Sequence, residues 1–273
     1  MEQSAEEIKS LVKKRYASLA KEKSGPCCAP EAAMSPGCCN TSAAPCQTQT
    51  IAERLYNSDE LEQLPGEVTD ISLGCGNPTA IAELSEGEVV LDLGSGGGID
   101  CFLSAQKVGT QGKVIGLDMT QEMIQLAREN AQKIGASNVE FRLGEMEHMP
   151  VADNSVDVII SNCVINLSPD KDAVFKESYR VLKPGGRLCV SDIVLLGELA
   201  PEIKNDLSNW VSCIAGALPQ DKYLGKIRAA GFKKMELVDT TEWIPERRPP
   251  ETQKALTGKL ASLKIKAFKP GKA

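Results

Sequence analysis

Apolar runs and helical patterns alternate along the middle of the chain. The run 88–93 is continuous and is followed directly by glycines, which is typical of a parallel strand buried on both faces. Similar runs recur at 113–118, 138–144, 155–161 and 187–194. Between them, apolar residues at helical spacing predict helices over about 99–108, 120–135 and 169–182. This alternation predicts a doubly wound, mostly parallel α/β sheet.

The two ends of the chain follow other patterns. Residues 5–23 carry apolar side chains at helical spacing and predict an amphipathic helix. Residues 24–50 hold five cysteines among small and polar residues, so we expect a loop or a disordered arm. Residues 196–230 predict a mostly helical insert between the fifth and sixth strands. Two closing strands are expected at 233–243 and 260–268, the second with an exposed, lysine-rich face and a frayed tail.

Charge and hydropathy exclude several classes of function. The chain has 273 residues and a formal net charge of -6, which argues against nonspecific binding to nucleic acid or to an anionic membrane. It contains no apolar run long enough for a transmembrane helix, and its first residues are charged, unlike a secretory signal. We therefore expect a cytoplasmic protein without nucleic-acid or membrane partners.

Sulfur is the unusual component of this chain, which has ten cysteines and a single histidine, His148. In a reducing compartment, a surplus of cysteines indicates metal binding or thiol chemistry rather than structural disulfides. The lone histidine leaves little material for imidazole catalysis, and we expect it to be a solvated loop residue. The paired cysteines of 24–50 do not have zinc-finger spacing, so no structural metal is expected.

The glycine-rich segment 91–98 (LDLGSGGG) predicts a ligand-binding turn at the end of the first strand. Glycine lets a backbone turn sharply and approach a ligand closely, and ligands of open α/β sheets bind at this edge. Asp118, at the end of the second strand, is placed to accept hydrogen bonds from a ribose diol. A dinucleotide is disfavoured, because Ile99 replaces the last glycine of its fingerprint and Asp92 would repel a pyrophosphate. A plain strand-to-helix turn is the remaining alternative.

The order D-x-G-x-G-x-G, from Asp92 to Gly98, followed by Asp118 resembles the class I S-adenosylmethionine-dependent methyltransferases, which are Rossmann-like. The resemblance implies a methyl donor bound at the glycine turn, with its adenine near 144–146. The segment 180–188 is similar to the helix–turn–strand that precedes their fifth strand, and we assign it no chemistry. At the matching positions, donor contacts are expected from Asp92, Gly94, Ser95, Gly96, Asp118, Met119, Thr120, Gly144, Glu145 and Asn162.

Three cysteines fall on segments that belong near this turn. Cys163 directly follows the fourth strand, Cys75 lies in the LGCGNP turn before the sheet, and Cys213 lies in the insert. Each one alone is as readily explained as a buried packing residue. Three of them on turns and covers around one pocket favour thiol chemistry. Cys101 and Cys189 fall within a predicted helix and a predicted strand, and we expect both to pack in the core.

The match becomes closer when the motifs are combined. SLGCGNP, VLDLGSGGGIDCFL, GLDMT, FRLGEMEHMPV, ISNCVINLSPDK and CIAGAL together resemble the arsenite S-adenosylmethionine methyltransferases, over residues 50–235. This resemblance implies trivalent arsenic held by the thiolates of Cys163 and Cys213. Cys75 and an N-terminal cysteine, for which we favour Cys46, would supply further ligands or a disulfide relay that restores arsenic to the trivalent state.

This chemistry agrees with the residues that are available. A soft, thiophilic centre selects thiolates over imidazole or carboxylate, and its lone pair attacks the donor methyl group without releasing a proton. The implied partners are arsenite and methylarsenite as substrates, with glutathione or thioredoxin as reductant. Two alternatives stay open: a methyltransferase of a small organic acceptor, and a non-catalytic, thiol-rich protein that binds arsenic.

These expectations divide the chain into three parts. Residues 1–50 form an N-terminal helix and a cysteine-rich arm, 51–195 form the S-adenosylmethionine-binding domain, and 196–273 form the substrate-binding insert and the closing strands. Within the insert, Trp210 either lines the substrate pocket or anchors the insert to the sheet. The anchor is the interpretation that we favour.

Overall fold

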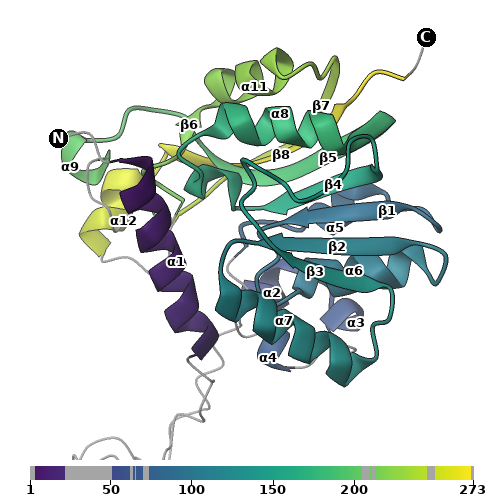
Figure 1. Ribbon diagram of the computed structural model, residues 1–273. Coiled ribbons are helices and arrows are strands. Elements are labelled where there is room, and N and C mark those ends of the chain that lie inside the picture. Colours follow the sequence, from purple (N-terminus) through teal and green to yellow (C-terminus); the bar gives the residue numbers. More distant parts are fainter. Residues whose placement is uncertain are drawn as a thin grey trace, which may run out of the picture.

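The computed structural model describes residues 4–21, 51–61, 64, 66–69, 74–204, 210, 213–244 and 250–271. These residues form an eight-stranded sheet with helices on both faces (Figure 1). The strands are β1 (Val89–Leu93), β2 (Lys113–Asp118), β3 (Val139–Leu143), β4 (Val156–Asn162), β5 (Leu182–Leu195), β6 (Leu218–Pro219), β7 (Lys234–Glu242) and β8 (Leu260–Phe268).

The sheet is mostly parallel, as the alternation of strands and helices predicted. Its order is β3-β2-β1-β4-β5-β8-β7, and the short strand β6 pairs with β5 beside this path. Strands β1 to β6 pair in parallel, whereas β8 runs antiparallel to both of its neighbours. The chain enters the sheet at β1, in the middle, and continues outward through β2 to β3. It then crosses back to β4, which lies on the other side of β1. In such a sheet, ligands bind at the carboxyl ends of the two strands where the direction changes.

Alternating side chains of the strands contribute to two separate cores. In β1, Leu91 and Leu93 pack in the core that contains Phe175 of α8, while Val90 packs with Phe102 of α6. The helices therefore cover both faces, which confirms the doubly wound class. They are α1 (Ala5–Lys21), α2 (Ile51–Leu55), α3 (Ser58–Leu61), α4 (Gly66–Thr69), α5 (Pro78–Ala82), α6 (Ile99–Val108), α7 (Gln121–Ile134), α8 (Lys171–Val181), α9 (Pro201–Lys204), α11 (Gln220–Ala229) and α12 (Pro250–Leu256), with the 3-10 turn η1 (Ile165–Leu167).

The prediction of an exposed, lysine-rich final strand is wrong. Strand β8 lies between β5 and β7, and most of its side chains are buried. Lys266 is buried and forms an ion pair with Glu83 at 2.6 Å. Lys269 is buried too, and its Nζ donates to the carbonyl oxygens of Tyr179 and Leu182, each at 2.7 Å. Lysine has a long apolar stem, so its presence in a strand does not by itself indicate an exposed face.

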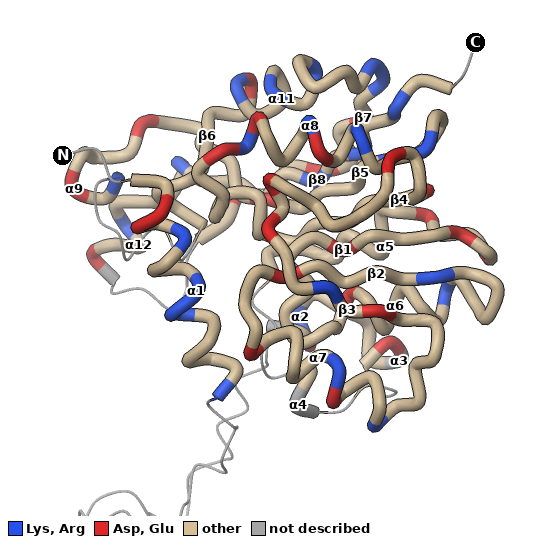
Figure 2. The backbone as a smooth tube through the Cα atoms, in the orientation of Figure 1, with Lys and Arg blue, Asp and Glu red and all other residues tan. Residues whose placement is uncertain are grey.

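The predicted insert contributes a strand as well as helices. In its described part, α9, β6 and α11 lie between β5 and β7, and β6 extends the sheet next to β5. Acidic and basic residues are interspersed along the described chain (Figure 2). Of the described helices, none is both long and apolar enough to cross a membrane.

Helix α1 lies across the carboxyl ends of the strands (Figure 1). Ile8 and Val12 of α1 are buried in a third apolar cluster, which also contains Cys75, Cys163 and Cys213. This cluster lies next to the end of β4, where the fold places ligands. The amphipathic helix predicted over 5–23 is therefore present, and its apolar face covers the predicted site.

Candidate functional site

The turn after β1 needs glycine at three positions. Gly94, Gly96 and Gly98 have φ angles of 68°, 51° and 99°, in the left-handed region that favours glycine. A side chain at Gly94 would also overlap Val164. Because these residues carry no side chains, their backbone is open to a ligand, and α6 begins directly after the turn at Ile99.

Asp118, at the end of β2, faces this glycine turn. Its carboxylate accepts hydrogen bonds from the backbone N–H groups of Gly96 at 3.0 Å and Thr120 at 2.8 Å. Burial raises the pKa of Asp118, although these two backbone donors act in the opposite direction. Thr120 occupies the N-cap position of α7, but its side chain makes no capping bond. Its backbone N–H instead holds Asp118 in place.

A cleft opens beside Asp118, and we call it the Asp118 cleft. Its walls are α1, the glycine turn and the segments that follow β2, β3 and β4. A nucleoside fits a cleft with the glycine turn on one side and Asp118 at the end of β2, because a ribose diol donates to a carboxylate. Six of the predicted donor contacts line this cleft: Gly94, Gly96, Asp118, Met119, Thr120 and Gly144.

A second cleft lies between the glycine turn and the end of β4, and we call it the Cys163 cleft. Ser95, Asp100, Asn162 and Cys163 are among the residues that line it. The hydroxyl of Ser95 is buried and has no hydrogen-bond partner among the described residues. Buried hydroxyl groups are normally paired, so this one is available to a polar ligand.

Two predicted donor contacts lie outside the walls of both clefts. Asp92 is buried and accepts a hydrogen bond from the thiol of Cys101 at 3.2 Å, and burial raises the pKa of this carboxyl group well above its ordinary value. Glu145 turns towards α1, where it pairs with Lys9 at 2.7 Å and Lys13 at 3.0 Å. Asp92 is therefore placed to support the site from behind, and Glu145 is placed to support it from the rim.

Asn162, the last residue of β4, connects the Cys163 cleft with the turn that carries Cys75. Its Oδ1 accepts from the backbone N–H groups of Cys75 at 3.1 Å and Gly76 at 3.3 Å. Its Nδ2 donates to the carboxylate of Asp100 at 3.2 Å and to the hydroxyl of Tyr56 at 3.1 Å. One amide group thus fixes both an acidic wall of the cleft and the position of a cysteine.

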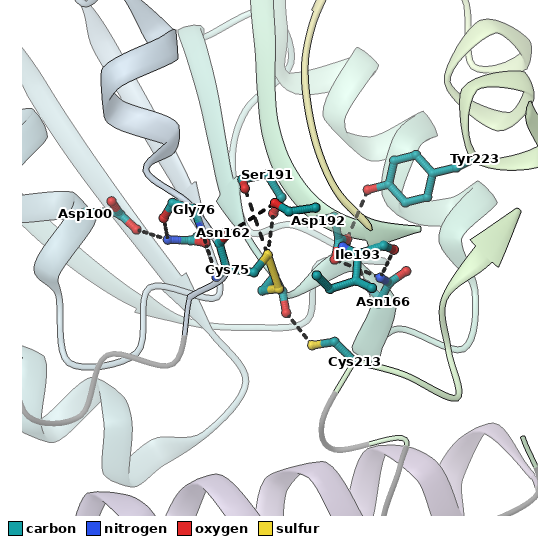
Figure 3. Close-up of a disulfide and its surroundings, with 12 residues drawn as sticks. Cys75, Gly76, Asp100, Asn162, Asn166, Ser191, Asp192, Ile193, Cys213 and Tyr223 are labelled. Atoms are coloured by element: carbon teal, nitrogen blue, oxygen red, sulfur yellow. Dashed lines mark hydrogen bonds between the residues drawn. A yellow bond between two sulfur atoms is a disulfide. The ribbon is translucent and has the colours of Figure 1, made fainter. Parts of the chain in front are cut away.

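The structure joins Cys75 and Cys163 in a disulfide (Figure 3). The glycines on either side of Cys75 make this approach possible. A side chain at Gly74 would overlap Asn162, and one at Gly76 would overlap Ser191 of β5. The LGCGNP motif therefore holds a cysteine directly against the ends of β4 and β5.

Cys213 reaches the same place from the insert (Figure 3). Its Sγ donates to the carbonyl oxygen of Cys163 at 2.7 Å. Cys163 and Cys213 have φ angles of 58° and 61°, which are unusual for residues other than glycine. Such strain costs about 1–3 kcal/mol per residue and gathers at functional sites. Burial raises the pKa of the Cys213 thiol well above its ordinary value, so this group is protonated at neutral pH.

A buried polar network supports these cysteines from behind. Asp192 of β5 accepts from the amide of Asn166 at 2.8 Å and from the hydroxyl of Tyr223 at 3.1 Å, and burial raises its pKa to about 7. The Nζ of Lys171 donates to the carbonyl oxygen of Ser168 at 3.0 Å, and burial lowers its pKa to about 8. The network fixes the η1 segment, which follows Cys163 directly.

Trp210 joins the insert to η1. Its indole N–H donates to the carbonyl oxygen of Leu167 at 3.1 Å, and its own carbonyl oxygen accepts from the backbone N–H of Cys213 at 3.0 Å. These contacts make Trp210 an anchor of the insert, although to η1 and not directly to the sheet as the favoured interpretation had it. They also explain how a segment of the insert brings a thiol to the end of β4.

The other described thiols and the imidazole lie away from this cluster of cysteines. Cys101 and Cys189 are buried in the core on the α6 side of the sheet, as expected, and His148 is exposed. Cys46 lies outside the described residues. The sequence interpretation missed Asp100, although it follows the glycine turn directly within the quoted GGGIDC segment.

Comparisons with known proteins agree with this geometry. Residues 84–232 match a family model described as a methyltransferase domain. An arsenite methyltransferase of Halobacterium salinarum is 42% identical over 274 residues, covering 98% of this chain and 68% of that protein. The human arsenite methyltransferase is 40% identical over 209 residues, covering 73% of this chain and 53% of that protein. The chain thus spans about two thirds and about half of the lengths of these two relatives.

A solved structure is similar as well. It is an arsenic (III) S-adenosylmethionine methyltransferase from Chlamydomonas reinhardtii, which matches with a TM-score of 0.68 and 34% sequence identity. The match covers 78% of this chain and 73% of that one.

Proposed function

The chain belongs to the arsenite methyltransferase family, and from this we propose that it transfers the methyl group of S-adenosylmethionine to trivalent arsenic held by cysteine sulfur. One observation carries the proposal. Cys75, Cys163 and Cys213 come from distant parts of the sequence and meet beside the glycine turn, at the edge of the sheet where ligands bind.

The two clefts fit S-adenosylmethionine. Asp118 would accept the ribose hydroxyl groups, and the backbone of the glycine turn would pass beneath the donor. In the Cys163 cleft, the unpaired hydroxyl of Ser95 and the carboxylate of Asp100 suit the two charged groups of the methionine part. When bound, this donor supplies an electrophilic methyl group on a positively charged sulfur.

Arsenic would bind to Cys163 and Cys213, with Cys75 as the third thiol of the site. Trivalent arsenic prefers sulfur ligands, and arsenite binds each thiol with loss of one water molecule, so no proton acceptor is required. Because Cys163 is bonded to Cys75 in the structure, arsenic binding first requires reduction of this disulfide. A thiol reductant such as glutathione or thioredoxin supplies the two electrons and two protons and becomes a disulfide itself.

Methyl transfer then needs positioning more than acid or base catalysis. The arsenic lone pair forms the new arsenic–carbon bond, the carbon–sulfur bond breaks, and the sulfur of the donor takes that electron pair and becomes neutral. Arsenic is thereby oxidised from the trivalent to the pentavalent state. Holding two reactants in line accounts for a large part of such a rate enhancement. The strained turns at Cys163 and Cys213 are suited to fix arsenic in this way.

The Cys75–Cys163 disulfide supports a relay that returns arsenic to the trivalent state. Two thiolates leave pentavalent arsenic as a disulfide, and the two electrons that they lose remain on arsenic. A disulfide between Cys75 and Cys163, the pair that is joined in the structure, would be the product of such a step. A reducing compartment such as the cytoplasm suits this cycle, because each turnover consumes two thiol equivalents.

The proposal is tested by incubation with arsenite, glutathione and S-adenosylmethionine labelled in its methyl group. Wild-type protein should yield methylated arsenic. Cys163→Ser and Cys213→Ser should each lower the rate about a thousandfold or more, because arsenic loses a ligand and its alignment. Both variants should still bind S-adenosylhomocysteine.

Full activity of either variant would contradict the proposal. Tight arsenite binding by wild-type protein without methylated product would instead identify a binding protein. Methyl transfer to a small organic acceptor, with both cysteine variants fully active, would support the alternative acceptor class.

A further inference from the structure

Tyr16 occupies a special place between the two clefts. It lies on α1 and lines both the Asp118 cleft and the Cys163 cleft, a property it shares with Gly94, Gly96 and Val164. Tyr16 is the aromatic member of this group, and its ring also packs against the cluster that contains the three site cysteines. An aromatic side chain therefore covers the point where the clefts meet.

Ion pairs at the rim of the Asp118 cleft hold α1 over this point. Lys9 pairs with Glu145 at 2.7 Å and with Glu147 at 3.1 Å, and Lys13 pairs with Glu145 at 3.0 Å. Val12, one turn before Tyr16, is buried beneath the helix. The ring of Tyr16 is thus positioned by contacts on the preceding turns of α1.

We expect the positively charged sulfur of the donor to lie where the two clefts meet. The nucleoside fits the Asp118 cleft and the methionine part fits the Cys163 cleft, so the sulfur that joins them lies between. Its methyl group must face the cysteines. This assignment rests on the proposed function, and it places a positive sulfur next to the ring of Tyr16.

We propose that the ring of Tyr16 contacts the sulfonium of S-adenosylmethionine and distinguishes this charged donor from the neutral product, S-adenosylhomocysteine. The face of an aromatic ring attracts a cation and has no such attraction for a neutral thioether. This attraction favours binding of the donor over binding of the product, and it disappears once the methyl group has left the sulfur. Burial raises the pKa of the Tyr16 hydroxyl, so the side chain remains a neutral phenol.

The test compares the affinities of both ligands, measured by calorimetry without arsenic. Tyr16→Leu removes the ring, Tyr16→Phe keeps it, and Val12→Ala shortens a neighbouring wall of the same cleft. Tyr16→Leu should weaken S-adenosylmethionine binding about threefold to thirtyfold more than S-adenosylhomocysteine binding. Tyr16→Phe should keep the wild-type ratio of the two affinities, and Val12→Ala should weaken the binding of both ligands to the same extent.

Equal weakening of both ligands by Tyr16→Leu would overturn the proposal, since the ring would then serve only to pack α1. If Tyr16→Phe also lowered the preference for S-adenosylmethionine over S-adenosylhomocysteine, the proposal would be overturned too, because the hydroxyl and not the ring would then distinguish the two ligands. Circular dichroism and thermal unfolding show whether each variant is folded. Arsenic methylation by wild-type protein is scored separately, so a failure of this inference is distinct from a failure of the proposed function.

Discussion

The donor side and the cysteine side of the site are built in different ways. On the donor side, the glycine turn and Asp118 lie at the ends of adjacent strands. The Gly96 N–H joins them directly, and the N–H of nearby Thr120 also holds Asp118. On the cysteine side, Cys75 and Cys163 are separated by 88 residues, and Cys213 lies 50 residues further on. One half of the site is local, and the other is assembled from remote turns.

This difference has a consequence for the effects of substitutions. The local half depends on a few backbone conformations, so single glycines should dominate donor binding. The remote half depends on the supports that bring three segments together, among them Asn162, Trp210 and Asp192. Substitution of Trp210 or Asp192, which line neither cleft, should affect the thiols while the donor is still bound.

Among substitutions other than those of the cysteines, the largest expected effect is on the donor side. Gly94→Ala introduces a side chain at a φ of 68° and against Val164, and Gly96→Ala introduces one at a φ of 51° into open space. A left-handed alanine costs about 1–2 kcal/mol, so Gly96→Ala should weaken S-adenosylhomocysteine binding about tenfold, and Gly94→Ala about a hundredfold or more. Calorimetry measures both. Similar losses in the two variants would show that Val164 does not restrict the turn.

Asn162 tests how far the two halves are independent. Asn162→Ala removes the acceptor for the N–H groups of Cys75 and Gly76, and a lost buried partner costs about 1–3 kcal/mol. We expect Cys75 and Cys163 to form their disulfide about tenfold less readily in a fixed glutathione buffer.

Asn138→Ala is the matched control for Asn162→Ala. The amide of Asn138, at the amino end of β3, donates to the carbonyl oxygens of Ala105 and Gly109, and not to the segments that carry Cys75 and Cys163. Mass spectrometry of trapped thiols should show wild-type disulfide formation in this control. An equal change in both variants would mean that general destabilisation is responsible.

The pH dependence of Cys213 gives a smaller effect that belongs to the cysteine side alone. Burial raises the pKa of its thiol above the ordinary value, so the reactive thiolate is scarce until the pH exceeds that value. In reduced protein, alkylation of Cys213 by iodoacetamide should rise about tenfold per pH unit through pH 9. Peptide mapping separates Cys213 from the other thiols. A rate that becomes constant below pH 8 would contradict a protonated, buried thiol.

The smallest expected effect concerns the ion pairs of α1. The double variant Lys9→Ala and Lys13→Ala removes both partners of Glu145, and half-exposed pairs of this kind contribute up to about 1 kcal/mol each. Donor affinity should fall about threefold at low salt, and the difference from wild type should shrink as salt is added.

Lys21→Ala is the control for these ion pairs. Lys21 pairs with Glu122 at 3.0 Å from the far end of α1, and it does not line either cleft. Its substitution should leave donor affinity unchanged. A loss equal to that of the double variant would mean that the charges of α1 act at long range.

The local half of the molecule could be predicted from the sequence. Strand β1, the glycine turn and Asp118 follow one another closely, and each is specified by its own residue types. The same is true of α7, which ends at Gly135 with a φ of 67°. Hydrophobic periodicity and the positions of glycines are local signals, and they were sufficient to predict these elements.

The remote half could be predicted only in part. Position after a strand marked Cys163 as a candidate, but nothing in the sequence paired it with Cys75. The family resemblance grouped Cys163 with Cys213, and Cys75 with an N-terminal cysteine, whereas the structure joins Cys75 to Cys163. The place of α1 over the clefts was missed, because an amphipathic pattern shows that a helix has an apolar face without showing what that face covers. The buried position of β8 was misjudged for the same reason, since its partners are distant in sequence.

Strand β8 also sets the order in which the site is completed during synthesis. Its residue Ser262 donates to the carbonyl oxygen of Cys75 at 3.1 Å, and its backbone pairs with β5 over nine residues, from Arg187 to Leu195. The ribosome makes β8 later than the other seven strands of the described sheet. Until then, β5 has an open edge and the Cys75 turn lacks one of its supports. A nascent chain therefore lacks this support of the Cys75 turn, and this neighbour of β5, until β8 has been made.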